Sequence, residues 1–292
     1  MAAVPSIEPL LDQVRDVVRR DAPHLERLLE IFAQEARVGR EWLTPSLNRL
    51  APGAVILEVG AGLMLLSCQL AREGFRVVAL EPVGEGFSSF AELQKLILAH
   101  AEQRGIAPDV LPIPVEELEA NGKFDFAYSI NVMEHVGNFA VALDRVGRAI
   151  RPGCEYRFMC ANYLFPYEPH FNIPTLFSKS LTEKLFRRRI YANTRVGDAA
   201  GVWKSLNWIT VPKVVRAVRN LSGVSVSFDR SMLEAVLLRA VGDREFSERR
   251  SPWIRRLAKG AVGLGLHRLG RWIPPFLQPV MDCSMKRRAG VQ

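Results

Sequence analysis

Two acidic residues flank a glycine turn near position 60. Glu58 precedes Gly60 and Gly62, and Glu81 follows an apolar run at residues 77–80. Because glycine lacks Cβ, such a turn can adopt positive φ angles and allows the backbone to approach a ligand closely. A carboxylate at the end of the second strand of a βαβ unit can accept hydrogen bonds from the two hydroxyls of a ribose. We therefore predict that this turn binds a cofactor containing a nucleoside.

The residues around the turn have the pattern of a strand, a helix and a second strand. Apolar residues at 55–59 predict a buried parallel strand, and residues 63–72 predict a helix. A dinucleotide fingerprint requires Gly or Ala at position 65, where this chain has Leu65. Glu58 would also place a negative charge beside a pyrophosphate. Both features argue against NAD, and Glu58 suits a ligand that carries an amino group and a sulfonium.

These residues resemble motif I of the class I S-adenosylmethionine-dependent methyltransferases, E/D-x-G-x-G-x-G. The third glycine of that motif is replaced by Met64. The resemblance implies S-adenosylmethionine as the cofactor, with Glu81 as the acid that ends the second strand. It also places Glu116, at the end of a third strand predicted at 110–115, against the adenine amino group. The predicted cofactor-binding residues are Glu58, Gly60, Gly62, Glu81, Glu116 and Asn131.

A second segment supports the same family. Residues 124–130 read as a strand, and a loop, a helix and a Pro-Gly turn into another strand follow. This order is similar to the fourth strand, helix and L-x-P-G-G loop of the methyltransferases, with Cys154 in place of the second glycine. The resemblance covers about residues 51–163. It implies a doubly wound α/β fold with a seven-stranded sheet, mostly parallel with the last strand antiparallel, and with N-terminal helices and helical or loop insertions.

The flanking segments complete the predicted domain organisation. Helical spacing of apolar residues within 1–50 predicts helices, which in this family lie over the cofactor pocket as a lid. Residues 51–292 form the predicted methyltransferase domain. Within it, residues 164–203 are rich in proline and aromatic residues and form an insertion, and residues 231–279 form a basic amphipathic connection between the sixth and seventh strands.

His135 is the first candidate catalytic residue. Methyl transfer from a sulfonium needs orientation and, for a hydroxyl acceptor, a base, and histidine can take a proton near neutral pH. Glu134 can orient that base. The Glu-His-Val segment is similar to the quinone-biosynthesis O-methyltransferases, some of which bind metal through an acid three residues before the Glu. Asn131 stands there instead, so we assign no metal. The alternative role for Glu134 and His135 is to cap the following helix.

His170 is the second candidate catalytic residue. It lies within the predicted insertion among residues suited to lining an acceptor pocket. A structural histidine in a loop fixed by prolines is an equal alternative. The neighbours that define this candidate pocket are Tyr163, Tyr167, Glu168, Phe171 and Asn172.

The charge of the chain is concentrated at its C-terminal end. Residues 249–292 contain ten Lys or Arg residues and one acid, within a chain whose net charge is +8. Trp253 and Trp272 lie near the ends of an amphipathic stretch there, a composition typical of an interfacial helix. We expect an anionic membrane surface as a possible partner through 249–292, although a packed helix with solvated arginines is the alternative. Without a signal peptide or an apolar run of about 18 residues, we expect a cytoplasmic protein, peripheral at the inner face of the membrane.

The predicted activity is methyl transfer to a small or lipid-linked acceptor. The predicted reaction is O-methylation of a sugar, a quinol or phenol, or a carboxylate. Two other functions fit parts of the sequence. A nucleic-acid methyltransferase fits the basic end, but the N/D-P-P-Y/F motif is replaced by residues 129–136, SINVMEHV. A catalytically inactive binding protein with a methyltransferase fold fits the departure at Met64, whereas the two intact acids and two glycines argue against it.

Overall fold

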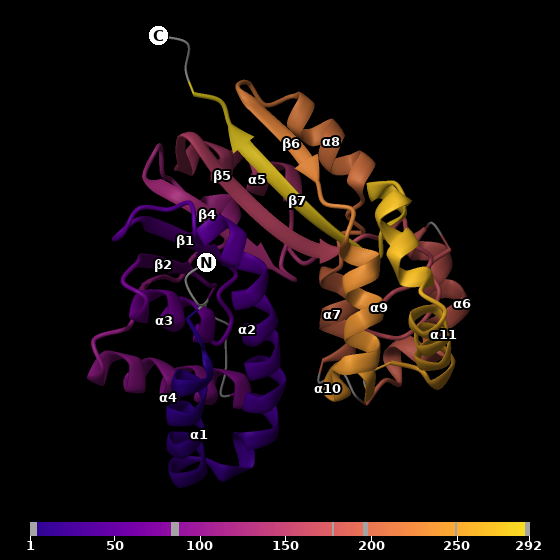
Figure 1. Ribbon diagram of the computed structural model, residues 1–292, viewed down its shortest axis with the longest axis horizontal. Coiled ribbons are helices and arrows are strands. Elements are labelled where there is room, and N and C mark those ends of the chain that lie inside the picture. The colour runs from indigo at the N-terminus through magenta and orange to yellow at the C-terminus, as the bar shows by residue number, and fades with distance from the viewer. Residues whose placement is uncertain (1–4, 83–87, 177, 195–197, 249, 290–292) are drawn as a thin grey trace. The chain divides into compact units, whose positions relative to one another are not determined.

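The computed structural model describes residues 5–82, 88–176, 178–194, 198–248 and 250–289 (Figure 1). Arg249, which belongs to the predicted basic end, lies outside these ranges, as do parts of the predicted lid, insertion and C-terminal region at 1–4, 177, 195–197 and 290–292. The chain divides into two compact units, one formed by residues 1–129 and 148–154 and the other by residues 130–147 and 155–292.

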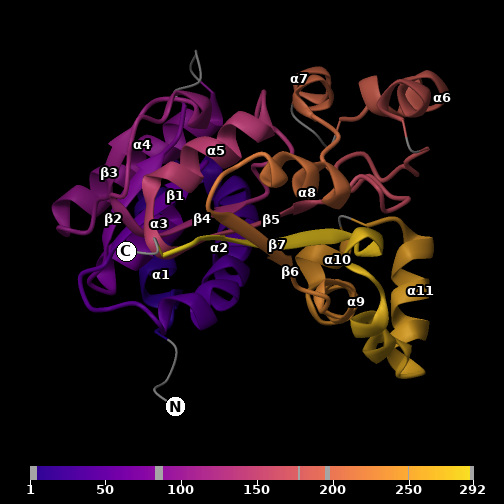
Figure 2. The same ribbon diagram turned by 90° about the horizontal axis from the view of Figure 1, so that it is seen from above.

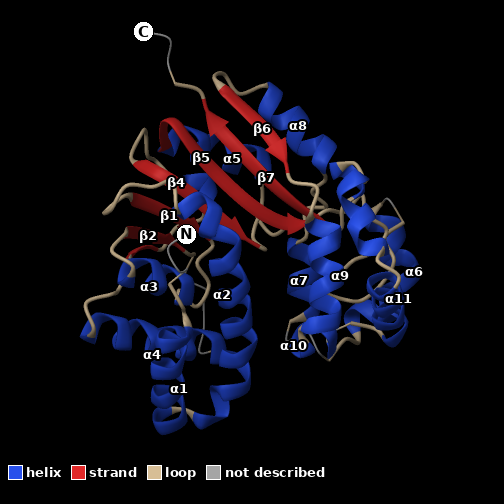
Figure 3. Cartoon of the chain, in the orientation of Figure 1, coloured by secondary structure: helices blue, strands red, loops and turns tan. Residues whose placement is uncertain are grey.

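Within the described residues, seven strands form a mixed sheet with the order β3-β2-β1-β4-β5-β7-β6 (Figure 3). β1 pairs in parallel with β2 and β4, and β7 runs antiparallel to both β5 and β6. This arrangement confirms the predicted fold class. The strands are β1 Val55–Val59, β2 Arg76–Leu80, β3 Asp109–Leu111, β4 Phe124–Ile130, β5 Ile150–Ala161, β6 Val224–Phe228 and β7 Val280–Arg287.

The helices follow the alternating pattern expected of this fold, with additional helices after β5 and after β6. The α-helices are α1 Glu8–Asp21, α2 Glu26–Leu47, α3 Leu65–Arg72, α4 Ser89–Gln103, α5 Phe139–Ala149, α6 Lys179–Tyr191, α7 Ala199–Ser205, α8 Val211–Arg219, α9 Met232–Gly242, α10 Arg244–Glu248 and α11 Pro252–Gly263. Short 3₁₀ helices are η1 Pro23–Leu25, η2 Val115–Glu117, η3 Leu266–Trp272 and η4 Pro275–Leu277.

The two N-terminal helices are part of the core of the first unit. Their buried apolar side chains share one hydrophobic cluster with residues of α3 and α4, and Figure 1 shows α1 and α2 beside these helices. Arg40 of α2 also forms a buried bidentate ion pair with Glu73, with both nitrogen–oxygen distances at 2.7 Å. The helices predicted within 1–50 are therefore present, and their role as a lid stays a prediction.

The third strand is shorter than the sequence pattern predicts. The prediction of a strand over 110–115 is wrong at its C-terminal end, because β3 ends at Leu111. Pro112 and Pro114 have no backbone N–H to donate to a neighbouring strand, so they end the pairing. Glu116 consequently lies in η2 and not at the end of a strand.

The connection between β6 and β7 folds into several short helices in the second unit. Figure 2 shows α9, α10 and α11 grouped together, and both α11 and η3 pack against α9. The amphipathic stretch does not form one continuous helix, because α11 ends at Gly263 and Gly265 adopts a φ of 72°. A Cβ on Gly270 would lie 3.1 Å from the backbone nitrogen of Glu234, so glycine allows η3 to approach α9 closely.

No helix in the described ranges combines the length and the apolar character needed to cross a bilayer.

Candidate active site

The glycine turn after β1 has the backbone conformation that its sequence predicts. Gly60 and Gly62 have φ angles of 72° and 55°. Met64, which replaces the third motif glycine, also lies in the left-handed region, with a φ of 62°. This conformation costs a residue with a Cβ about 1–2 kcal/mol, whereas burial of a methionine side chain contributes about 1.5–3 kcal/mol. Because Met64 is buried in the core, the substitution preserves the course of the turn.

Glu81 connects the end of β2 to this turn. Its Oε2 accepts a hydrogen bond of 2.8 Å from the backbone N–H of Gly62. The carbonyl of Gly62 in turn accepts a 2.7 Å hydrogen bond from the side-chain amide of Gln94 on α4. The turn is therefore held through both the backbone N–H and the backbone carbonyl of Gly62. Burial raises the pKa of Glu81, opposed by the hydrogen bond from Gly62.

Glu58 lies at the start of the same turn and is buried. Its carboxylate accepts a hydrogen bond from the hydroxyl of Ser67 on α3. Burial raises the pKa of Glu58 to about 7, because the hydrogen bonds that stabilise the charged form only partly offset the loss of solvent and the charge of Glu81 adds to it. Two acids that are costly to ionise thus adjoin one turn, and a cationic ligand would stabilise both in their charged forms.

The two remaining cofactor candidates occupy loops. Glu116 is half-buried in η2. Asn131 follows β4 with a φ of 56°, and its backbone N–H donates a 2.8 Å hydrogen bond to the carbonyl of Met159 on β5. The side chain of Asn131 is exposed. The roles of both residues toward the cofactor stay predictions.

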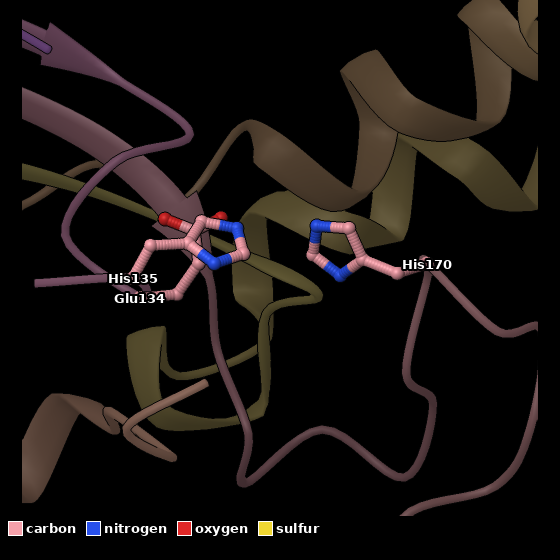
Figure 4. A group of neighbouring side chains, drawn as sticks. All are labelled: Glu134, His135 and His170. Carbon is pink, nitrogen blue, oxygen red and sulfur yellow. The ribbon is translucent and has the colours of Figure 1, made fainter. Parts of the chain in front are cut away.

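The three predicted catalytic residues converge in the second unit. Glu134 and His135 lie in the loop after β4, and His170 lies in the segment after β5 (Figure 4). Each side chain offers one potential ligand atom, and these atoms all lie within 4.8 Å of one another. The imidazole centroids of His135 and His170 are 5.2 Å apart. Residues 35 positions apart in the sequence therefore form one group of side chains, which we call the catalytic cluster.

Asn207 holds the loop that carries Glu134 and His135. Its backbone N–H donates to the carbonyl of Glu134 at 2.8 Å. Its side-chain amide donates to the carbonyls of Met133 and Val136 at 2.7 and 2.9 Å. Asn207 lies between α7 and α8 outside any motif, so the sequence alone does not identify it.

A different residue supplies the side-chain cap of α5. The Oδ1 of Asn138 accepts hydrogen bonds from the backbone N–H groups of Ala140 and Val141 at 3.1 and 3.2 Å. This is the geometry of an N-cap. The alternative in which Glu134 and His135 cap this helix is therefore wrong.

Glu134 is the most deeply buried member of the cluster, with an exposed fraction of 1%. Its Oε1 accepts one long hydrogen bond, 3.5 Å, from the backbone N–H of Ala161. Its Oε2 has no hydrogen-bond partner among the described residues. Burial raises the pKa of Glu134 to about 7, and the charge of His170 opposes that shift. A buried carboxylate oxygen without a donor is costly, so the site is suited to a proton or a cationic ligand.

His170 is positioned by the carboxylate of Glu168, which is completely buried. The Nδ1 of His170 lies 2.6 Å from the Oε1 of Glu168. The same carboxylate accepts hydrogen bonds from the backbone N–H groups of His170 and Phe171, at 3.1 and 2.7 Å. Burial lowers the pKa of His170, but the hydrogen bond and charge of Glu168 outweigh it, so that the net shift is upward.

His135 is positioned by Ser205 at the end of α7. The Nδ1 of His135 lies 2.8 Å from the Ser205 hydroxyl, which donates its own proton to the carbonyl of Val202 at 2.8 Å. These partners assign the proton to Nδ1 and leave a lone pair on Nε2. Burial, together with the charge of His170, lowers the pKa of His135 to about 4. His135 is therefore neutral at physiological pH, and no sequence motif points to Ser205.

Two of the aromatic residues predicted to line an acceptor pocket pack against tryptophan side chains. Tyr163 stacks on Trp208 with a centroid separation of 4.4 Å, and Phe171 meets the edge of Trp203 at 5.6 Å. Tyr163 and Phe171 are both buried. Their packing holds the segment that carries Glu168 and His170.

The fold agrees with the comparison to known proteins. A family model described as a methyltransferase domain matches residues 31–168. Residues 31–168 therefore form a methyltransferase domain.

Relatives of this methyltransferase fall into two groups. An uncharacterized protein of Mycobacterium tuberculosis strain H37Rv is 46% identical over 282 residues, which cover 97% of this chain and 95% of the relative. A ubiquinone biosynthesis O-methyltransferase of Paramagnetospirillum magneticum is 36% identical over 118 residues, which cover 40% of this chain and 43% of that enzyme. The similarity to the second protein thus spans less than half of either chain.

Among solved structures, the methyltransferase is similar to phosphoethanolamine N-methyltransferase 2 of Haemonchus contortus in complex with phosphomonomethylethanolamine and S-adenosylhomocysteine. The TM-score is 0.52 at 14% identity, and the match covers 95% of this chain and 60% of the nematode chain. At this identity the similarity establishes the fold.

The buried carboxyl of Glu58 predicts a specific dependence of stability on pH. Its pKa is about 7 in the folded chain against an ordinary value of 4.5. Between these values the folded state holds a proton that the unfolded state has lost, so the contribution of this group is complete below pH 4.5 and is lost as pH rises through 7. Between pH 5 and pH 8, we expect the free energy of unfolding of the cofactor-free wild type to fall by up to about 3 kcal/mol more than that of Glu58→Gln.

Denaturant unfolding at the two pH values measures this difference. Glu119→Gln, at an exposed position, is the matched control and should follow the wild type. Parallel pH profiles for the wild type and Glu58→Gln would contradict the assignment of a raised pKa to Glu58.

Proposed function

We propose that this methyltransferase transfers the methyl group of S-adenosylmethionine to a hydroxyl oxygen of a small or lipid-linked acceptor, and that the catalytic cluster binds that hydroxyl. The observation that carries the proposal is the convergence of Glu134, His135 and His170 within 4.8 Å. A hydroxyl loses its proton as its oxygen attacks carbon, so oxygen transfer benefits from a group that accepts the proton. The cluster supplies imidazole and carboxylate acceptors for it.

The reaction is a single displacement at the methyl carbon. The acceptor oxygen forms the new bond to carbon, the carbon–sulfur bond breaks with its electron pair left on sulfur, and the hydroxyl proton passes to the cluster. The sulfonium charge is lost in this step, so the main requirement is alignment of oxygen, carbon and sulfur. The hydrogen bonds that the two imidazole Nδ1–H groups donate to Ser205 and Glu168 fix both rings for this task.

One further fact supports oxygen as the acceptor atom, and a second supports the place of the catalytic cluster beyond the carboxyl end of a strand. The partial relatives of this chain include enzymes described as ubiquinone biosynthesis O-methyltransferases. The glycine turn follows β1, and the loop that carries Glu134 and His135 follows β4, its parallel neighbour. In open α/β sheets ligands bind beyond the carboxyl ends of the strands.

For the cofactor, we assign the ribose hydroxyls to Glu81 and the positively charged methionine portion to the environment of Glu58. Gly60 and Gly62 supply backbone that a ligand can approach, and Glu116 and Asn131 complete the proposed set. The support for Glu81 is its place at the end of β2, where its carboxylate already accepts from the N–H of Gly62.

The exposed apolar residues of the second unit support a lipid-linked acceptor. Leu264 and Trp272 are 76% and 81% exposed. Exposed basic residues alternate with the apolar ones on the same elements, and contiguous exposed apolar area is typical of interaction sites. The interfacial surface, as we call it, consists of Trp253, Arg256, Leu257, Lys259, Leu264, Leu266, Arg268, Leu269, Arg271 and Trp272. We propose that it binds anionic membranes and so gives access to an acceptor carried by a lipid.

Replacement of Glu81 tests the cofactor site. Charge-assisted hydrogen bonds contribute about 1.5–3 kcal/mol each, so we expect Glu81→Ala to weaken S-adenosylmethionine binding tenfold or more. Isothermal titration calorimetry measures the affinity, and Glu119→Ala is the matched control. Unchanged affinity in a folded Glu81→Ala protein would remove Glu81 from the site.

Replacement of the histidines tests the reaction. With methyl-labelled cofactor and panels of phenols, sugars and carboxylates, with amines as a separate panel, we expect transfer to hydroxyl acceptors. His135→Ala and His170→Ala should lower turnover about 10²–10⁴-fold while leaving cofactor affinity unchanged, because neither ring belongs to the proposed cofactor set.

The exposed histidine variant His24→Ala is the control for these measurements. Transfer to amines alone would overturn the assignment of oxygen. Full turnover in both cluster variants would remove the cluster from the reaction. Cofactor binding without transfer to any panel would favour a binding protein that retains the methyltransferase fold.

Cosedimentation with lipid vesicles tests the interfacial surface. Each basic residue held near an anionic surface contributes about 1 kcal/mol, screened beyond a Debye length of about 8 Å at physiological salt. We expect the wild type to sediment with vesicles containing phosphatidylglycerol at low salt. Arg256→Glu with Lys259→Glu should release it, and Trp272→Ser should weaken binding at any salt concentration. A wild type that stays in solution at low salt would refute membrane binding and favour a soluble acceptor.

A further inference from the structure

We propose that the catalytic cluster is a metal site, in which Glu134, His135 and His170 bind one divalent transition-metal ion of the Zn²⁺ class. The proposal extends beyond methyl transfer, because binding of the ion depends only on these side chains and their partners. It contradicts the expectation, drawn from Asn131, that this chain binds no metal. That expectation considered ligands within one loop, whereas the third ligand now proposed comes from the segment after β5.

Both imidazoles present the same nitrogen to the centre of the cluster. The Nδ1 atoms of His135 and His170 are engaged by Ser205 and Glu168 respectively. Because the Ser205 hydroxyl donates to Val202 and an ionised carboxylate only accepts, each Nδ1 carries a proton in the neutral ring and each Nε2 has a lone pair. Figure 4 shows the two rings side by side, each with one nitrogen directed toward the other ring.

Glu134 supplies an independent observation that points to a ligand. Its side chain is 1% exposed, and its Oε2 has no hydrogen-bond partner in the described structure. A buried carboxylate oxygen normally has a donor or a cation beside it. The ligand atom offered by Glu134 lies within 4.8 Å of those offered by the two histidines. Bonds of about 2.0–2.2 Å to Zn²⁺ place two ligand atoms up to about 4 Å apart, so small side-chain rotations would bring the three ligand atoms onto one ion.

The partners of the histidines are those that metal-binding histidines use. A ligating imidazole commonly donates its other N–H to a carboxylate or another oxygen, which fixes the ring and increases its basicity. Glu168 does this for His170 and is itself held by two backbone N–H groups. Ser205 does this for His135. The orientation of the His170 ring is thus set by a buried carboxylate, and that of the His135 ring by an exposed hydroxyl.

The donor set indicates the class of ion. Two imidazole nitrogens and one carboxylate match catalytic zinc sites with an open position and the two-histidine, one-carboxylate sites of non-haem iron. Mg²⁺ and Ca²⁺ prefer oxygen ligands. With three protein ligands, at least one coordination position remains for an exogenous oxygen.

An open position gives the ion a role in the proposed reaction. A hydroxyl bound to such an ion becomes more acidic. Because the ion would occupy the proton-accepting atoms of the cluster, the hydroxyl proton would leave to solvent and not to the cluster, and the resulting oxyanion would attack the methyl carbon. This last step rests on the proposed function. The metal site does not, and the two can fail separately.

Titration of metal-free protein with Zn²⁺ and Co²⁺ tests the site. We expect one ion per chain, a visible absorption band for bound Co²⁺, and affinity for Mg²⁺ at least a hundredfold weaker than for Zn²⁺. His170→Ala and Glu134→Gln should each weaken Zn²⁺ binding at least a hundredfold, and Glu168→Gln should weaken it about 10–100-fold. His24→Ala, at an exposed position, should bind as the wild type does. Far-ultraviolet circular dichroism verifies that each variant is folded.

The outcomes separate the metal site from the reaction. Absence of saturable Zn²⁺ binding and of a Co²⁺ band in the wild type would overturn the site, as would equal binding by wild type, His170→Ala and Glu134→Gln. Hydroxyl methylation that proceeds in protein shown to bind no ion would overturn the site and leave the proposed function intact. One ion bound through these residues, with no transfer to any hydroxyl, would support the site and overturn the function.

Discussion

The burial of carboxylates is the constraint on which the candidate active site depends. Glu58, Glu134 and Glu168 are all buried, and each acid must be neutralised or given donors because an ionised carboxylate away from water is costly. Glu168 is satisfied within the chain by an imidazole and two backbone N–H groups. Glu134 is not satisfied in this way, and Glu58 accepts a hydrogen bond from Ser67 that only partly offsets its burial, so the pKa of each of these two acids is raised to about 7.

This difference separates structural acids from acids that await a ligand. A buried carboxylate with several donors holds its loop in place, as Glu168 does for residues 168–173, where the backbones of Glu168 and Ile173 also pair. A buried carboxylate with a raised pKa favours a cation or a proton in its vicinity. S-adenosylmethionine carries positive charge, so Glu58 fits one such ligand. The Oε2 of Glu134 has no hydrogen-bond partner among the described residues. It would favour a second cationic ligand, which the two neighbouring imidazoles would also bind.

Sequence reasoning succeeded where the signal was local. The strands at 55–59 and 124–130 were predicted with their observed bounds, because apolar runs between turn residues are a short-range property. It failed at the third strand, where Pro112 and Pro114 outweigh an apolar run that would otherwise continue. It also missed the break of the amphipathic stretch at Gly263, since spacing at three and four residues continues across the left-handed turn at Gly265.

The candidate site shows the same limit more sharply. Glu134 and His135 are adjacent and follow a predicted strand, so they were found together. His170 reaches these two residues because aromatic packing holds the segment that carries it. The pairs are Tyr163 with Trp208 and Phe171 with Trp203. No local sequence pattern encodes this packing. Ser205 and Asn207 act through hydrogen bonds to His135 and to the loop backbone. Neither residue type is unusual in a connecting segment, so only the folded structure identifies them.

The position of these supporting residues bears on how acceptor specificity is distributed in the chain. The family model ends at residue 168, and the partial relatives cover about two-fifths of the chain. His170, Ser205 and Asn207 all lie beyond the matched domain, as does the whole interfacial surface. The Mycobacterium tuberculosis relative, by contrast, matches 97% of the chain. A shared methyltransferase domain therefore accounts for the similarity to the ubiquinone biosynthesis enzymes without implying a shared acceptor. Comparison of acceptors should accordingly begin with the full-length relative, because its match extends beyond the domain to almost the whole chain.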